Sequence, residues 1–324
     1  MYVVHSLNEL RAQSGFEDVV IACGVFDGVH RGHQRIVSRL ERLAEKYGAH
    51  PVVVTFEPHP RAVLYPEEPP QYLTTTKQKS RIFRELGVEG MVILPFSAQM
   101  ADTLPEDFLT REILGQGVRV RGICVGENWR FGRGSQCGDV RLLRKVGGEY
   151  NVEVDAVSPF RWYGYAVSST RIRKAIAENR LEHAARMLTR PHTVRGTVQG
   201  GIAQAGEVLK RPTANLADPL IMLPPAGVYA AGADLDPDNN SGRHSCCCSI
   251  VYIGDAPTFA EKKRSLGGQT KAIEVHVFDF DGDLYGQTIE IQLRRFLRPS
   301  LQFDSPQALK EQIDRDIVEA KRVF

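Results

Sequence analysis

The chain has 324 residues, of which 42% are hydrophobic and 25% are charged, as in an ordinary globular protein. A formal net charge of only +2 excludes a global basic field for nucleic acid, so any anion site must be local. No apolar run approaches the roughly 18 residues of a membrane helix, and no basic leader precedes the first polar residues. We therefore expect a cytoplasmic protein of two domains, with neither a nucleic-acid nor a membrane partner.

Up to about residue 190, short β-branched runs alternate with helical patterns. Strands are expected at 18–24, 51–56, 90–96 and 118–126, and helices at 33–48, 76–87 and 105–117. Strands and helices that take turns with short connections predict a parallel sheet covered on both faces. Such a sheet binds ligands at the carboxyl ends of its strands.

After residue 190 the pattern becomes rich in strands with a period of two. Alternating segments occupy 227–235, 245–254, 272–280 and 287–297, and a helical pattern follows at 306–323. This predicts an antiparallel barrel or sandwich closed by a terminal helix, with a polar hairpin tip at 236–244. We place the domain boundary between residues 1–188 and 189–324.

The six cysteines occur without a C-x-x-C pair, and three of them, Cys246 to Cys248, are consecutive. Alternation along a strand would point these three to opposite faces, which suits neither a disulfide framework nor a metal cage. We expect reduced cysteines in the core.

The stretch GVFDGVHRGH, residues 24–33, joins the first of these strands to a helix. Its small residues let the backbone approach a ligand, and the helix N-terminus offers unpaired N–H groups to an anion. His30 and His33 are placed to donate ring N–H bonds to phosphate oxygens there. The alternative is a pair of surface histidines on an ordinary turn, but strand, glycine turn and helix together favour the phosphate site.

This stretch resembles the H-x-G-H loop of the nucleotidylyltransferase superfamily, in the form of the bacterial bifunctional riboflavin kinase/FMN adenylyltransferases. Segments resembling the adenylyltransferase module are TFEPHP (55–60), VGENWRFGRGSQCGD (125–139) and VSSTRIRKAI (167–176). Segments resembling the kinase module are RPTANL (211–216), GVYA (227–230), YIGDAPTF (252–259), EVHVFDFDGDLYG (274–286) and FLRPSLQFDS (296–305). The resemblance covers almost the whole chain. It implies an α/β nucleotidylyltransferase-type parallel sheet followed by a riboflavin kinase-like antiparallel β-barrel.

For the first module the resemblance implies adenylyl transfer: the FMN phosphate attacks the α-phosphate of ATP, pyrophosphate leaves and FAD results. An in-line displacement needs positioning and hydrogen-bond donors rather than a protein nucleophile. By this resemblance His30 and His33 hold the ATP phosphates, while Gly24, Phe26 and Gly28 shape the approach.

Three further segments supply binding candidates for this module. The resemblance assigns Ser169, Thr170 and Arg173 to the ATP phosphate site, although these residues alone fit an N-cap on an amphipathic helix equally well. Asn128 lies in a glycine-bounded loop beside aromatic and cationic residues, and we expect it to bind flavin. His59 stands between two prolines that would present it rigidly; a proline-rich turn with an idle histidine is the alternative.

For the second module the resemblance implies phosphorylation of riboflavin by ATP and Mg²⁺. It places the proton acceptor on Glu274, which without that likeness would read as an exposed strand glutamate. Magnesium prefers hard oxygen ligands, which suits the Thr213 hydroxyl and the Asn215 side chain together with nucleotide phosphates.

The chain departs from the family pattern at residues 206–211, GEVLKR. Glu207 stands where arginine is common, and Lys210 and Arg211 replace a Gly-Phe pair. A carboxylate near a triphosphate repels it, whereas the two cations restore positive charge from another position. A monofunctional FMN adenylyltransferase with an impaired kinase module therefore remains an alternative. A non-catalytic flavin- or nucleotide-responsive regulator is a second, and the intact pair His30 and His33 argues against it.

Overall fold

A computed structural model describes residues 1–134, 137–199, 214–217, 221–238, 246–255 and 271–324. The chain folds as two compact units, Met1–Ser169 and Thr170–Phe324. Almost all of α8 (Ser169–Ala177) and the whole of α9 (Leu181–Leu188) thus group with the second unit. The functional boundary between residues 188 and 189 stays a prediction.

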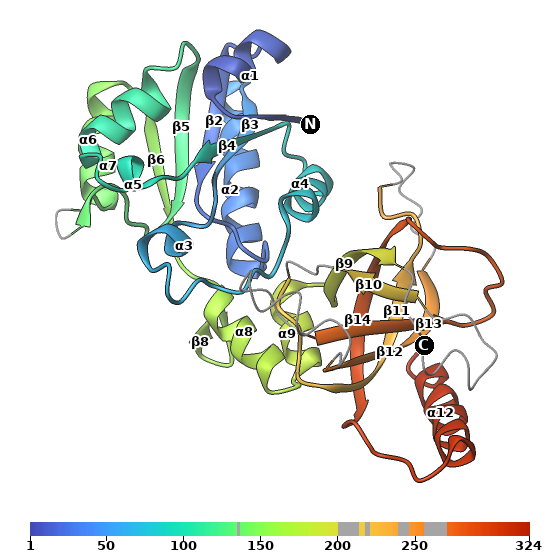
Figure 1. The fold of residues 1–324 in the computed structure, drawn as a ribbon. Helices are drawn as coiled ribbons and strands as arrows, with labels where there is room; N and C mark the ends of the chain where they lie inside the picture. The colour runs from blue at the N-terminus through green and yellow to red at the C-terminus, as the bar shows by residue number, and fades with distance from the viewer. Residues whose placement is uncertain (135–136, 200–213, 218–220, 239–245, 256–270) are drawn as a thin grey trace. The chain divides into compact units, whose positions relative to one another are not determined.

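The first unit is built on a six-stranded parallel sheet with the order β1-β4-β3-β2-β5-β6 (Figure 1). Its strands are β1 (Tyr2–Val4), β2 (Asp18–Cys23), β3 (His50–Glu57), β4 (Gly90–Pro95), β5 (Arg119–Gly126) and β6 (Glu153–Val157). The predicted parallel sheet is confirmed, and β1 and β6 extend it at its two edges.

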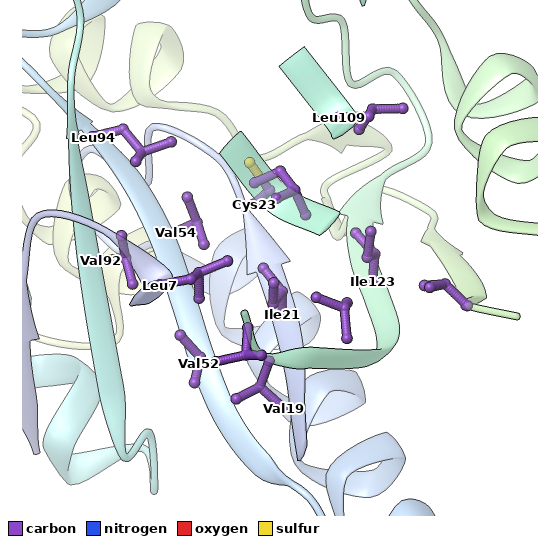
Figure 2. Close-up of a cluster of buried hydrophobic side chains, with 14 of the residues drawn as sticks. Leu7, Val19, Ile21, Cys23, Val52, Val54, Val92, Leu94, Leu109 and Ile123 are labelled. Carbon is purple, nitrogen blue, oxygen red and sulfur yellow. The ribbon is translucent and has the colours of Figure 1, made fainter. Parts of the chain in front are cut away.

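Both faces of this sheet are buried, as the continuous apolar runs require. On β2, Val19, Ile21 and Cys23 pack into one core cluster, and Val20 and Ala22 pack into another. Figure 2 shows the first cluster, where side chains of β2, β3 and β4 meet those of α1 and the segment after α6. This face is covered by α1 (Leu7–Ser14) and α7 (Val140–Glu149), and the other by α2 (Arg31–Tyr47) and α4 (Thr76–Glu85).

Helix α2 follows from the pattern of its residues. Ile36, Val37, Leu40, Leu43 and Ala44 recur at helical spacing and are all buried against the sheet. Gly48 ends the helix in the left-handed conformation, where a glycine has no Cβ to clash. The helix begins at residue 31, two residues before the predicted start, and so includes both histidines in or beside its first turn.

Short elements connect these layers. They are α3 (Pro60–Leu64), α5 (Ala98–Ala101), α6 (Pro105–Phe108), a π-helical turn (Leu109–Leu114) and the hairpin β7 (Arg161–Trp162) with β8 (Tyr165–Ala166). The single helix predicted over 105–117 is wrong in detail. The Thr110 hydroxyl donates to the carbonyls of Glu106 and Asp107, a contact that often bends helices.

The second unit contains a closed six-stranded antiparallel barrel with the order β10-β13-β12-β11-β14-β9. Its strands are β9 (His192–Gln199), β10 (Ala214–Ala217), β11 (Gly227–Asp234), β12 (Cys246–Asp255), β13 (Lys271–Val277) and β14 (Thr288–Arg298). Tyr229 and Ala231 face the interior, whereas Val228 and Ala230 lie under the terminal helix α12 (Pro306–Lys321). The barrel, rather than the sandwich, is therefore the observed form, and the terminal helix is confirmed.

All six cysteines are free thiols. Cys247 packs on the barrel interior and Cys248 on the outer cluster, so the predicted alternation is confirmed. The expectation of a core position is wrong for Cys246, which is exposed at the start of β12. Among the described residues, no helix has both the length and the apolar composition that crossing a membrane requires.

Candidate nucleotide and phosphate sites

The strand order has a topological switch point at the carboxyl ends of β2 and β5. These two strands pair side by side, with Ala22 opposite Cys124, but the chain after β2 leads to β3 on one side and the chain after β5 leads to β6 on the other. Open α/β sheets bind ligands at such a switch point. The loop 24–30 and the loop after Gly126 both begin here.

The loop after β2 has a strained backbone. Phe26, Gly28 and Val29 all adopt positive φ angles, of 53°, 85° and 38°. Such a conformation costs a non-glycine residue on the order of 1 kcal/mol, and more for a β-branched valine. Phe26 and Val29 are almost completely buried, so packing of their side chains offsets this cost. Strain of this kind is concentrated at functional loops.

The two histidines lie together at the start of α2. His30 is the N-cap, and its Nδ1 accepts a hydrogen bond from the backbone N–H of His33 at 3.4 Å. The two rings stack with centroids 3.6 Å apart. Gly32 leaves room for this arrangement, because a Cβ there would lie 3.1 Å from the His30 ring. With Nδ1 accepting, a neutral His30 carries its proton on Nε2, where it is a hydrogen-bond donor.

The N-terminus of α2 is electrostatically positive. The amides of Arg31 and Gly32 have no carbonyl four residues back within the helix, and the first turn contains no acidic residue. The guanidinium of Arg31 lies over the ring of Phe160, with its carbon 5.3 Å from the centroid. These features make the N-terminus of α2 a suitable anion site.

Ser169, at the first position of α8, reaches this loop directly. Its hydroxyl donates to the backbone carbonyl of Asp27 at 2.8 Å, so its proton is committed to the loop rather than to a ligand. Thr170 and Arg173 belong to the second unit, and their assignment to the ATP phosphates stays a prediction.

His59 follows β3 and Asn128 follows β5, the two strands that flank β2, so both come after the carboxyl ends of strands in the middle of the sheet. His59 caps α3, with Nδ1 accepting from the Arg61 N–H at 3.1 Å, and its ring meets Tyr72 edge-on. Asn128 is exposed in the loop after β5. The neighbouring Trp129 stacks on Phe131 and joins the hydrophobic core. The expected ligand roles of His59 and Asn128 stay predictions.

Sequence reasoning missed a buried polar group beneath the loop. The carboxylate of Asp27 is 3% exposed and accepts hydrogen bonds from the backbone amides of Leu73 and Thr74. The Thr74 hydroxyl accepts from the Gly28 amide at 2.9 Å. Burial lowers the pKa of nearby Lys79, while the negative charges of Asp27 and Glu57 oppose that shift. The only sequence signal for this group was the aspartate within GVFDG, because its partners Leu73 and Thr74 lie 46 and 47 residues later in the chain.

In the barrel, Glu274 and Asn215 are direct neighbours across strands. Asn215 on β10 stands opposite Glu274 on β13, and Glu274 stands opposite Tyr252 on β12. Glu274 is only partly exposed, and this burial raises the pKa of its carboxyl, which favours proton acceptance nearer neutral pH. Thr213 and the altered segment 206–211 lie outside the described residues.

The chain matches known families along almost its whole length. A family model described as FAD synthetase matches residues 12–171, and one described as riboflavin kinase matches residues 188–324. The bifunctional riboflavin kinase/FMN adenylyltransferase of Escherichia coli strain K12 is 32% identical over 100% of this chain and 98% of its own. That of Pseudomonas fluorescens is 34% identical over 99% of this chain and 97% of its own.

A solved structure has the same fold. A crystal structure described as a macrolide-efflux protein from Streptococcus pneumoniae aligns with a TM-score of 0.80 and 26% identity, covering 99% of each chain. The fold and the resemblance predicted from sequence are thus confirmed. With this full-length likeness and both family models in chain order, the chain belongs to the bifunctional riboflavin kinase/FMN adenylyltransferase family.

Proposed function

We propose that this chain phosphorylates riboflavin to FMN and then transfers an adenylyl group from ATP to FMN, giving FAD and pyrophosphate. The observation that carries the proposal is the loop at the β2/β5 switch point, where two stacked imidazoles join the open N-terminus of α2. Family membership over the whole chain supports both activities.

In the adenylyl transfer, the ATP phosphates lie against the N-terminus of α2. His30 and His33 donate hydrogen bonds to oxygens that gain charge as the FMN phosphate attacks the α-phosphorus and the bond to pyrophosphate breaks. Gly24, Phe26 and Gly28 keep the backbone close to the nucleotide. A lost donor of this kind typically costs 10²–10³ in rate.

Five further residues complete the proposed adenylyltransferase site. Asn128 binds the flavin from the loop after β5, and His59 and Arg173 contact ATP together with Thr170. Ser169 supports the site through its hydrogen bond to the Asp27 carbonyl. The proposed extent of this module is 1–188, and that of the kinase is 189–324.

In the kinase reaction, Glu274 accepts the proton of the ribityl hydroxyl as that oxygen attacks the γ-phosphate of ATP. Asn215 stands opposite Glu274 in the pairing of β10 with β13, and its amide oxygen is a hard donor of the kind that Mg²⁺ prefers. Thr213 and the nucleotide phosphates are the other ligands we propose. A bound Mg²⁺ neutralises phosphate charge in such reactions.

The free thiols fit a reducing compartment, and the need for ATP fits the cytoplasm. We infer that the protein works in the cytoplasm.

The test of the proposed function uses the purified full-length chain with ATP, Mg²⁺ and either riboflavin or FMN, with products separated by chromatography. The proposal expects FMN and FAD from riboflavin, and FAD from FMN. FAD from FMN with no product from riboflavin would identify a monofunctional adenylyltransferase, and no product from either would identify a non-catalytic regulator.

A further inference from the structure

The strained loop after β2 needs something to hold it, and its side chains do so only in part. Phe26 and Val29 are fixed by burial of their own side chains. Gly28, which also has a positive φ angle, has no side chain to pack. Its backbone amide is therefore one of the groups that fix its position.

That amide is the start of a short hydrogen-bond relay. The Gly28 N–H donates a hydrogen bond to Thr74 Oγ1 at 2.9 Å. The Thr74 hydroxyl in turn donates to Asp27 Oδ1, at an O–O distance of 3.5 Å. The same Asp27 oxygen accepts from the backbone amides of Leu73 at 2.9 Å and Thr74 at 3.2 Å. The relay thus closes on the residue next to the one where it began.

The segment on the far side of the relay is itself rigid. Leu73 and Thr74 are buried, and Thr75 starts α4 with a reciprocal capping box to Gln78. Lys79, one turn into the same helix, is buried and attracted by the Asp27 carboxylate. The loop is therefore tied to the start of a helix that the sheet holds in place.

We propose that Asp27 and Thr74 are positioning residues for adenylyl transfer: they hold the Gly28 amide, and with it the turn that presents His30, in the geometry that binds ATP phosphates. The inference rests on the function proposed above for this loop. Neither residue needs to touch substrate. They act through the backbone between Asp27 and His30. The Ser169 hydroxyl also binds this backbone, at the carbonyl of Asp27.

The test compares Thr74→Val, which keeps the shape of the side chain and removes the hydroxyl, with Thr74→Ser, which restores it. Thr110→Val is the matched control, since its hydroxyl bonds only to carbonyls of its own helix turn. For each variant we would measure kcat and KM for ATP in FAD formation from FMN, riboflavin phosphorylation, the melting temperature, and amide exchange of a peptide covering 24–34.

Thr74→Val should lower kcat/KM for FAD formation at least tenfold and speed exchange in the 24–34 peptide. Riboflavin phosphorylation should be unchanged, and Thr74→Ser should recover most of both losses. The proposal is overturned if Thr74→Val makes FAD at the wild-type rate, if the exchange of the loop peptide does not change, or if Thr110→Val causes the same loss.

A second pair of variants covers the case in which Thr74→Val does not fold. Asp27→Asn keeps an oxygen that accepts from the two amides, whereas Asp27→Ala removes it. Loss of FAD formation should be larger in Asp27→Ala, and equal losses would contradict the relay. If wild-type protein makes no FAD from FMN, the proposed function fails, while the exchange measurement still decides whether the relay holds the loop.

Discussion

The proposed phosphate sites of the two units are built in different ways. In the first unit the two histidines and the three residues proposed to shape their loop lie within ten consecutive residues, 24–33, on a loop and the beginning of a helix. In the barrel the candidates Asn215 and Glu274 lie within strands and meet only because β10 and β13 pair in one register. The first set is visible as one sequence motif, whereas Asn215 and Glu274 belong to separate motifs and only the fold shows that they are neighbours.

The difference also sets how substitutions should act. The backbone amides at the N-terminus of α2 are kept whatever side chain is changed. In the first unit, therefore, several groups share the proposed binding of phosphate. In the barrel a single carboxylate is the proposed proton acceptor. The predictions that follow separate the two units by removing groups from one while the other serves as the internal reference.

The largest effect is expected from removing both imidazoles. The double variant His30→Ala/His33→Ala should lower the rate of FAD formation from FMN by about 10³ or more, because two donors to the charged phosphates are lost. Riboflavin should still be converted to FMN, which accumulates. Chromatography of both products measures this directly.

A matched control for that variant is His50→Ala, which removes a surface imidazole that pairs with Glu89 in the same unit. It should leave FAD formation near the wild-type rate. Loss of FMN formation in the double variant would show that the histidines act on the whole chain rather than on the adenylyl transfer.

The next effect concerns the barrel. Glu274→Gln keeps the shape of the side chain but removes the proton acceptor, and should lower riboflavin phosphorylation by about 10² or more. FAD formation from FMN should be unchanged. Glu319→Gln, on the exposed surface of α12, is the control. An equal loss of both activities would refute the division of work between the units.

Stability of the barrel should depend on His192 at mildly acidic pH. Burial lowers the pKa of this imidazole to about 4, and its Nε2 lies 2.7 Å from the Met222 carbonyl. Because the unfolded chain takes up this proton near pH 6.5, the free energy of unfolding should fall as pH drops from 6.5 towards 4.

The expected loss from His192 is about 2 kcal/mol between pH 7.5 and pH 5. Urea unfolding at the two pH values measures it. His192→Gln, which keeps a donor for the Met222 carbonyl, should lose about 2 kcal/mol less than wild type over that interval. An unchanged pH dependence in this variant would contradict the assignment.

The smallest effect is a shift in a pH profile. Burial raises the pKa of Glu274, and a proton acceptor must be ionised to work. The rate of riboflavin phosphorylation should therefore fall on acidification at a higher pH than an ordinary glutamate would give, with activity retained above the raised pKa. Profiles of kcat for both reactions would show whether this acidic limb belongs to the kinase alone.

Much of the fold could be predicted from periodicity, and the reason is physical. Strands of the parallel sheet are buried on both faces, so they read as apolar runs, and α2 shows its buried stripe at helical spacing. The π-helical turn after α6 could not be predicted, because residues 105–117 carry the same kind of apolar pattern as an ordinary helix.

The candidate sites could likewise be predicted from sequence only in part. His30 and His33 could be placed at a helix start from sequence, because a strand, small residues and a helix follow one another there. The hydrogen bonds that Asp27 accepts from Leu73 and Thr74 could not be predicted. Leu73 and Thr74 lie 46 and 47 residues after Asp27 and reach it only when the loop after β2 and the segment before α4 come together. The pairing of Asn215 with Glu274 depends likewise on strand register.

The central claim, that two separate sites act in sequence, is tested most directly by mixing the two variants that are each impaired in one step. Glu274→Gln and His30→Ala/His33→Ala are each supplied with riboflavin, ATP and Mg²⁺, alone and together. We expect rapid FAD formation only from the mixture, because FMN made by the histidine variant is used by the glutamate variant. FAD formed at the wild-type rate by either variant alone, or no gain in FAD from a mixture in which FMN accumulates, would contradict the account.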